Sequence, residues 1–172
     1  ACKKAIKIEP KNSNAYSNLG AALRECGSYQ DSVVACKKAI DIEPKNLGAY
    51  HNLGLSLQEL NELKKAIICY EEMVKIYPNN EIAYQNLGKI NTMLGKNEEA
   101  INFFNLAIKI NPKNLLNYYS LTDFNKKYLN KNLKEIINKV ISENNLNDKK
   151  NLAYANFLMS KYEYINKNYD KE

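Results

Sequence analysis

The stretch Ala1–Asn12, ACKKAIKIEPKN, returns almost unchanged as ACKKAIDIEPKN at Ala35–Asn46, and the two copies differ only where Lys7 becomes Asp41. The 34-residue spacing between the copies also separates four prolines, each followed two residues later by an asparagine. These pairs are Pro10 and Asn12, Pro44 and Asn46, Pro78 and Asn80, and Pro112 and Asn114. A fixed period of this length is typical of stacked supersecondary units.

Each period contains two helical patterns, in which apolar residues recur at spacings of three and four. In the period at 47–80 they are Tyr50, Leu53, Leu57 and Leu60, followed by Leu63, Ala66, Ile67, Tyr70 and Val74. Between the two patterns lies Gly27, Asn61 or Gly95, residues for which the left-handed turn conformation costs least. We expect the proline of each period to end the second helix.

Small residues recur in both helices of each period. The first helix carries Gly20, Gly54 and Gly88, and the second carries Ser32, Ala66 and Ala100. Because a missing side chain lets two backbones approach closely, we expect these positions to form the closest contact within each helix pair.

These motifs resemble the tetratricopeptide repeat, whose pattern W-x₂-L-G-x₂-Y, A-x₃-F and P is present here with tyrosine in place of tryptophan. The matching elements are Tyr16-x₂-Leu19-Gly20, Ala66-x₃-Tyr70, Ala100-x₃-Phe104 and the four prolines. The resemblance covers residues 1–114 and implies an all-α fold, a right-handed α-solenoid superhelix of antiparallel helix pairs. The first complete repeat departs from the pattern at Ser32-x₃-Cys36, where we expect looser packing.

The period predicts the organisation of one solenoid domain. Its expected segments are the end of the second helix of a truncated repeat at 1–12, repeats at 13–46, 47–80 and 81–114, a degenerate repeat at 115–148, and a C-terminal capping helix at 149–172. The chain is therefore expected to start inside a repeat. One stripe of the last helix should pack on the preceding repeat. A second stripe, with Tyr154, Phe157 and Tyr164, leaves open the docking of a partner or a second copy.

Composition argues against several classes of function. The 172 residues carry a net charge of +6, but acidic and basic residues are interspersed along the chain rather than clustered, so nucleic-acid binding is not expected. The sequence has no C-x-x-C pair and a single histidine, which argues against a metal site. Scattered thiols favour a reducing intracellular location, cytoplasmic or nuclear. The sequence has no 18-residue apolar run that would span a membrane.

The sequence also contains no catalytic constellation. His51 has no evident nucleophile, and there is no Gly-rich phosphate loop, so we expect neither catalysis nor a cofactor. We predict a non-catalytic protein interaction scaffold that binds an extended peptide segment in its concave groove. One alternative is the substrate-recruiting arm of a larger enzyme, such as an O-GlcNAc-type glycosyltransferase. Another is self-association through the repeats or the C-terminal helix.

Asn18, Asn52 and Asn86 lie one period apart on the first helices, so stacking should place them in a row. The repeats are similar to those of the O-linked N-acetylglucosamine transferase superhelix, which implies an asparagine ladder that grips a peptide backbone. One amide can donate and accept a hydrogen bond at once. The alternative is that asparagine is simply common at this position of an Asn-rich chain. The other residues predicted on this face are Asn14, Ser17, Arg24, His51, Leu55, Gln58, Ile82, Gln85 and Lys89.

One subtype of the family can be compared directly with these residues. Chaperone-adaptor tetratricopeptide domains clamp the terminal carboxylates of an acidic tail with Lys, Arg and Asn side chains. The matching positions here carry Ser17, Ala21, Ile82 and Asn86. Because the cations are missing from these positions, we do not expect binding of a chaperone tail.

Overall fold

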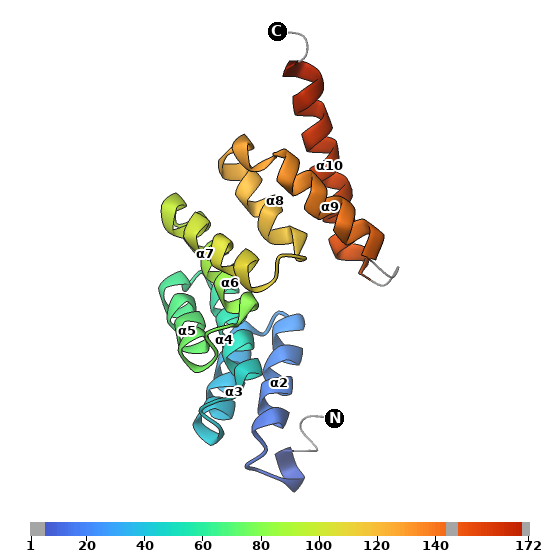
Figure 1. Cartoon of the computed structure of the whole chain (residues 1–172). Coiled ribbons are helices and arrows are strands. Elements are labelled where there is room, and N and C mark those ends of the chain that lie inside the picture. Colours follow the sequence, from blue (N-terminus) through green and yellow to red (C-terminus); the bar gives the residue numbers. More distant parts are fainter. Residues whose placement is uncertain (1–5, 144–147, 170–172) are drawn as a thin grey trace. The chain divides into compact units, whose positions relative to one another are not determined.

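The computed structural model describes residues 6–143 and 148–169, with side chains described up to residue 165. All regular structure in these ranges is helical (Figure 1). The chain divides into two compact units, residues 1–90 and 91–172. The repeat boundaries and the single solenoid domain expected from the sequence stay predictions.

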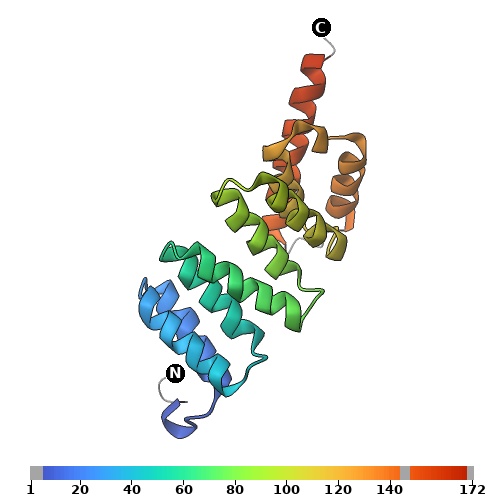
Figure 2. The same ribbon diagram turned by 90° about the vertical axis from the view of Figure 1, so that its left-hand side faces the viewer.

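The first unit consists of successive helices joined by short turns. They are α2 (Ser13–Glu25), α3 (Tyr29–Ile42), α4 (Leu47–Glu59), α5 (Leu63–Ile76) and most of α6 (Glu81–Met93). Helix α2 packs on α3 and α4, and α4 also packs on α3 and α5 (Figures 1 and 2). Before α2, residues 6–8 are helical, and Ile8 is exposed. Ala5, which the sequence assigns to the same apolar face, lies outside the described residues.

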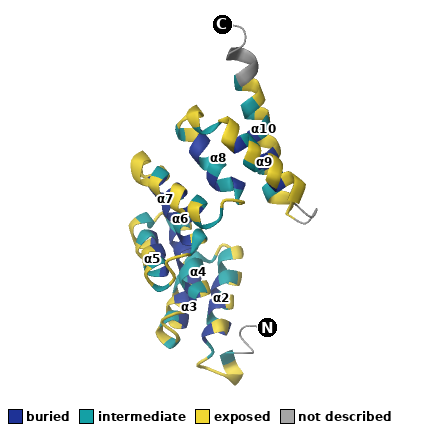
Figure 3. Cartoon of the chain, viewed as in Figure 1, coloured by how far each residue is buried: buried dark blue, intermediate teal, exposed yellow. Residues whose placement is uncertain are grey.

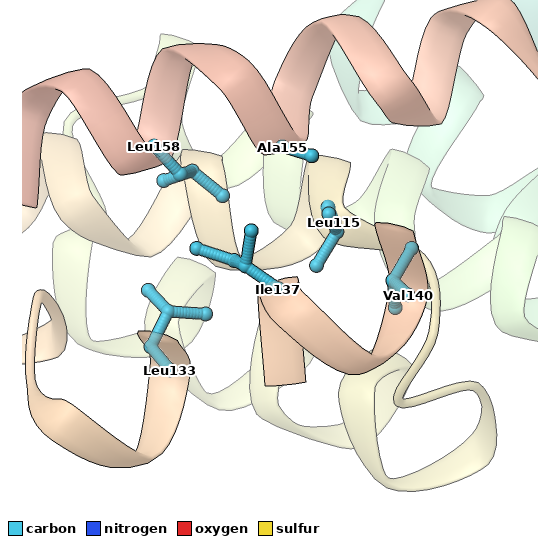
Figure 4. Packing of buried hydrophobic residues seen from close by; sticks show 6 residues of the cluster. All are labelled: Leu115, Leu133, Ile137, Val140, Ala155 and Leu158. Carbon is cyan, nitrogen blue, oxygen red and sulfur yellow. The ribbon is translucent and has the colours of Figure 1, made fainter. Parts of the chain in front are cut away.

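The second unit continues from the end of α6. Its elements are α7 (Asn97–Ile110), α8 (Leu115–Phe124), the short 3₁₀ helix η1 (Lys126–Tyr128), α9 (Lys131–Glu143) and α10 (Lys149–Tyr169). A core forms where α8, α9 and α10 meet (Figure 4). Its buried members are Leu115, Leu133, Ile137, Val140, Ala155 and Leu158.

The turns of the repeat have the local geometry that the sequence predicts. Gly27, Asn61 and Gly95 all have positive φ, at 77°, 57° and 72°. Helices α3, α5 and α7 end two residues before a proline, as expected for a residue that lacks an N–H and cannot continue the helix. The turn and helix-end predictions are therefore confirmed.

The asparagine after each proline begins the next helix. The Oδ1 atoms of Asn12, Asn46 and Asn80 each accept a hydrogen bond from the backbone N–H three residues later, at 2.8, 2.9 and 2.9 Å. Asn114 accepts from Leu116 N–H at 3.2 Å. These bonds satisfy N–H groups that have no partner within the helix. The recurring Pro-x-Asn is thus the end of one helix and the cap of the next.

The first complete helix pair is tightly packed, so the expected looser packing at Ser32 and Cys36 is wrong. Both residues are fully buried. The Ser32 hydroxyl donates to the Gly20 carbonyl at 2.7 Å, and its oxygen lies 2.7 Å from that of Ser56. A Cβ added to Gly20 would overlap the Cys36 sulfur. Buried polar atoms and a small thiol therefore fill the space that a larger aromatic ring takes in the general pattern.

The second pair makes its closest contact differently from the expectation. A Cβ on Gly54 would lie 2.5 Å from Cζ of Tyr70, so the neighbour of this glycine is the aromatic ring rather than the small Ala66. Tyr70 is fully buried, in line with the buried positions along α4 and α5 (Figure 3). The glycine makes room for the flat ring, which is the A-x₃-F element of this repeat.

The second stripe of α10 is partly covered by α8. Tyr119 lies 5.4 Å from the Tyr154 ring centroid and 5.1 Å from that of Phe157. Lys161 Nζ lies 5.1 Å from the centroids of both Tyr119 and Phe157, and 3.1 Å from Asp123 Oδ1. Much of this aromatic stripe is therefore engaged within the second unit, while Tyr164 is exposed.

Candidate functional site

The three asparagines of the predicted ladder occupy equivalent positions on α2, α4 and α6, but they differ in exposure. Asn18 is exposed, Asn52 is half-buried, and Asn86 is only 5% exposed. The ladder is therefore graded: its α2 end is open to solvent, and its α6 end is covered.

The amide groups of Asn52 and Asn86 already donate hydrogen bonds. Asn52 Nδ2 donates to the Ser17 carbonyl at 3.4 Å, across the contact between α4 and α2. Asn86 Nδ2 donates to the Ile82 carbonyl of its own helix at 2.8 Å. Since an amide nitrogen and oxygen act separately, the Oδ1 of Asn52 is suited to accept from a peptide N–H. Asn86 would have to change rotamer to reach a peptide.

The other predicted residues fall into structural and accessible groups. Ser17 and Gln85 are buried. Asn14 Oδ1 accepts from Asn46 Nδ2 at 3.2 Å, and Gln58 Nε2 donates to the Tyr70 hydroxyl at 2.7 Å. Burial of Ser17 and Gln85, and the hydrogen bonds of Asn14 and Gln58, give these four predicted residues a structural role. Leu55 is half-buried and Ile82 is 49% exposed, so both offer apolar surface.

The remaining predicted residues, Arg24, His51 and Lys89, lie on α2, α4 and α6. Burial lowers the pKa of His51, and the positive charges of Arg24 and Lys89 lower it further. Burial also lowers the pKa of the Lys89 ammonium. These shifts have the sign expected when charged groups lose water and lie near like charges.

Two residues important for this region were not among the predicted site residues. Asn46 donates to the Ser13 hydroxyl at 2.7 Å as well as to Asn14, so it fixes the start of α4 against the start of α2. Tyr70 orients Gln58 through its hydroxyl. Two features of the sequence could have identified these residues. Asn46 follows a recurring proline, and Tyr70 is the aromatic residue of the A-x₃-F element.

Within the described residues no group of His, Cys, Asp and Glu side chains could hold a metal ion. Burial raises the pKa of the Cys36 and Cys69 thiols to about 11, which disfavours the reactive thiolate. Across the described helices, none is long and apolar enough to cross a membrane.

Two hollows lie away from the predicted face. In the first unit, a pocket of about 400 Å³ is lined mainly by α3, α4 and α5, including Val33, Leu57 and Ile68. In the second unit, a pocket of about 420 Å³ lies at the starts of α8 and α10, beside Asn114 and Asn151. None of the predicted peptide-binding residues lines either pocket.

Repeated helix pairs with capped starts and left-handed turns define an all-α helical-repeat protein. Models of the tetratricopeptide repeat match residues 1–33, 20–61, 48–80 and 82–114. The chain belongs to the tetratricopeptide-repeat family, as the sequence motifs indicated. No curated protein sequence matches it significantly.

Solved structures share this fold. A crystal structure of MamA is similar over 100% of this chain and 88% of its own, with a TM-score of 0.66 and 20% identity. The Arabidopsis OM64 TPR domain is similar over 67% of this chain and 95% of its own, with a TM-score of 0.63 and 22% identity. A structure described as MamA MSR-1 C2 covers 65% of this chain and 64% of its own, with a TM-score of 0.57 and 21% identity. The predicted all-α tetratricopeptide fold is confirmed. The closer similarity to the O-GlcNAc transferase superhelix stays a prediction.

Proposed function

We propose that this chain is a non-catalytic interaction module that binds an extended segment of a protein partner along the face formed by α2, α4 and α6. Membership of the tetratricopeptide-repeat family supports a role as a protein interaction scaffold. The observation that carries the finer proposal is the graded row of amides, with Asn18 exposed and Asn52 half-buried on consecutive first helices.

An extended backbone presents alternating N–H and C=O groups, which a row of amides can match without reading the sequence of the segment. Each such hydrogen bond contributes a net of about 0.5–1.5 kcal/mol. Binding must also overcome the loss of freedom of the peptide, so two accessible amides are insufficient by themselves. Apolar surface at Leu55 and Ile82 and the cations of the same face would have to supply the remainder.

A selection from a displayed library of random peptides tests this proposal. The wild-type chain should retain peptides, and a variant with Asn18→Ala and Asn52→Ala should retain them at least about tenfold less well, the equivalent of about 1.4 kcal/mol. Replacing Asn102 and Asn105, which are exposed on α7, gives a matched control that should bind like the wild type. Equal retention by a folded Asn18 and Asn52 variant would remove the ladder from the mechanism.

A substrate-recruiting arm of a larger enzyme would use the same face. A catalytic domain encoded in the same full-length reading frame would distinguish this alternative from an independent scaffold.

Self-association is tested by light scattering over a range of concentrations. A constant monomeric mass would exclude self-association through the repeats or α10.

A further inference from the structure

The pocket of about 400 Å³ in the first unit, the α3–α5 groove, lies where α4 separates two other helices. Small residues bring α4 close to α2: Asn46 donates to the Ser13 hydroxyl at 2.7 Å, and a Cβ on Gly48 would lie 3.2 Å from Ser17 Oγ. Helix α4 also packs on both α3 and α5. It therefore forms the floor of the space between these two helices.

The α3–α5 groove has an aliphatic lining. Leu53, Leu57 and Leu60 form its floor along α4 and at the end of this helix, and its walls include Val33 on α3 and Ile68 on α5. Leu53 and Leu57 are buried, whereas Ile68 is 57% exposed, so apolar surface continues from the floor to solvent. Pockets of roughly 300–1,000 Å³ with an apolar lining and few polar groups are typical of small-molecule sites.

The rim of the α3–α5 groove carries one unpaired positive charge. Lys65 forms an ion pair with Glu62 at 2.5 Å, and Gln30 is neutral. Lys37 is exposed, and no carboxylate of the described residues forms an ion pair with it. Burial raises the pKa of the Cys69 thiol to about 11, and the positive charge of Lys37 opposes this rise. The Lys37 ammonium therefore lies near Cys69, which also lines the groove.

The next period of the sequence does not repeat this lining. One period later, Lys37 corresponds to Glu71, Leu57 to Asn91 and Ile68 to Asn102. Two of the aliphatic residues are thus replaced by amides, and the unpaired cation is replaced by an acid. The combination of an aliphatic lining with a free ammonium group is specific to these two repeats and is not a general consequence of repeated helix pairs.

We propose that the α3–α5 groove binds an aliphatic carboxylate, with its hydrocarbon chain over Leu53, Leu57 and Ile68 and its carboxylate beside Lys37. The chain gains about 25 cal/mol for each Å² of apolar surface that it buries on the leucine floor. A polar ligand such as a sugar would lose hydrogen bonds to water on this floor without replacing them. The carboxylate stays at the exposed rim, so it pairs with the ammonium without the cost of burying a charge. This site is separate from the proposed peptide face.

Methyl NMR spectroscopy with decanoate as the probe tests the proposal. The wild-type protein, labelled at its leucine, valine and isoleucine methyl groups, is titrated with decanoate below the concentration at which micelles form. The signals of Leu57 and Ile68 should shift and saturate, whereas those of Leu55 and Ile82 on the proposed peptide face should not shift. Absence of a saturable shift at Leu57 and Ile68 would overturn the proposal.

A pair of exposed apolar residues tests the contribution of the hydrocarbon chain. Ile68→Gln removes part of the groove wall and should weaken decanoate binding at least about threefold. Val34 lies one period earlier, is 68% exposed and does not line the groove, so Val34→Gln should bind like the wild type. An equal effect of the two changes would contradict the proposed position of the chain.

A pair of adjacent lysines tests the contribution of the carboxylate. The wild type should prefer decanoate over decanol by about two- to fivefold, the range expected for an exposed ion pair. Lys37→Gln should abolish this preference. Lys38→Gln, which removes an exposed charge outside the groove lining, should retain it. Loss of the preference in both variants or in neither would overturn the role of Lys37.

Other occupants of the α3–α5 groove would give different results. A second copy of the chain would make the Leu57 and Ile68 signals depend on protein concentration without decanoate. A membrane lipid would be indicated if phosphatidylglycerol vesicles broadened these signals while free decanoate left them unchanged. Decyltrimethylammonium would bind as tightly as decanoate if the charge at the rim had no effect. Each of these three results overturns the proposal.

Discussion

Replacing Gly54 by alanine tests how the second repeat is packed. The added Cβ would lie 2.5 Å from Cζ of Tyr70 and 2.9 Å from both Cε atoms. The ring has little freedom to move, because it is fully buried and its hydroxyl accepts a hydrogen bond from Gln58. The backbones of α4 and α5 must therefore separate to admit one methyl group.

The size of the effect follows from two opposing contributions. Alanine in place of glycine within a helix stabilises it by about 1 kcal/mol. Overpacking of a close contact costs about 1–3 kcal/mol, and three contacts under 3.0 Å to a fixed ring place Gly54 in the upper part of that range. We expect a net loss of about 1–2 kcal/mol in the free energy of unfolding for Gly54→Ala. Gly54→Leu should lose more.

Urea unfolding followed by far-UV circular dichroism measures this change. Gly48→Ala on the same helix is the control, since its nearest neighbour would be Ser17 Oγ at 3.2 Å, and it should cause little or no loss. In a Tyr70→Leu background the ring is absent, so Gly54→Ala should become neutral or stabilising. The same loss with and without the ring, or no loss in the wild-type background, would refute the packing argument.

Four further outcomes follow from single residues. Asn61 has φ at 57°, so Asn61→Ala should cost about 1–2 kcal/mol while Asn61→Gly should not, as measured by urea unfolding. Ser32→Ala leaves a buried carbonyl without its donor and should lower the unfolding free energy by about 1–3 kcal/mol. Burial lowers the pKa of His51 in the folded state, so folding favours the neutral ring. The free energy of unfolding should therefore decrease as the pH falls below about 6.5, the ordinary pKa of a histidine, and a His51→Gln variant should lack this part of the pH dependence. Burial raises the pKa of Cys36 to about 11, so a thiol reagent should modify exposed Cys26 at least about a hundredfold faster, and comparable rates would contradict the burial.

The helices and turns of this chain are predictable from sequence because their causes are local. A proline without an N–H ends a helix, an asparagine caps the next, and Gly27 or Asn61 adopts the left-handed turn. Each cause acts within a few residues and recurs every period. A single sequence is therefore enough to locate the helix ends and turns, without knowledge of how the repeats pack. The structure confirms these positions.

Exposure along the predicted face is less predictable from the sequence, because burial at one repeat position depends on its neighbours in space. Asn18, Asn52 and Asn86 share a register, yet Asn18 is exposed and Asn86 is covered. Asn52 also reaches the backbone of the preceding helix at Ser17. The period predicts that the three amides recur, but it contains no information about which of them packing leaves accessible.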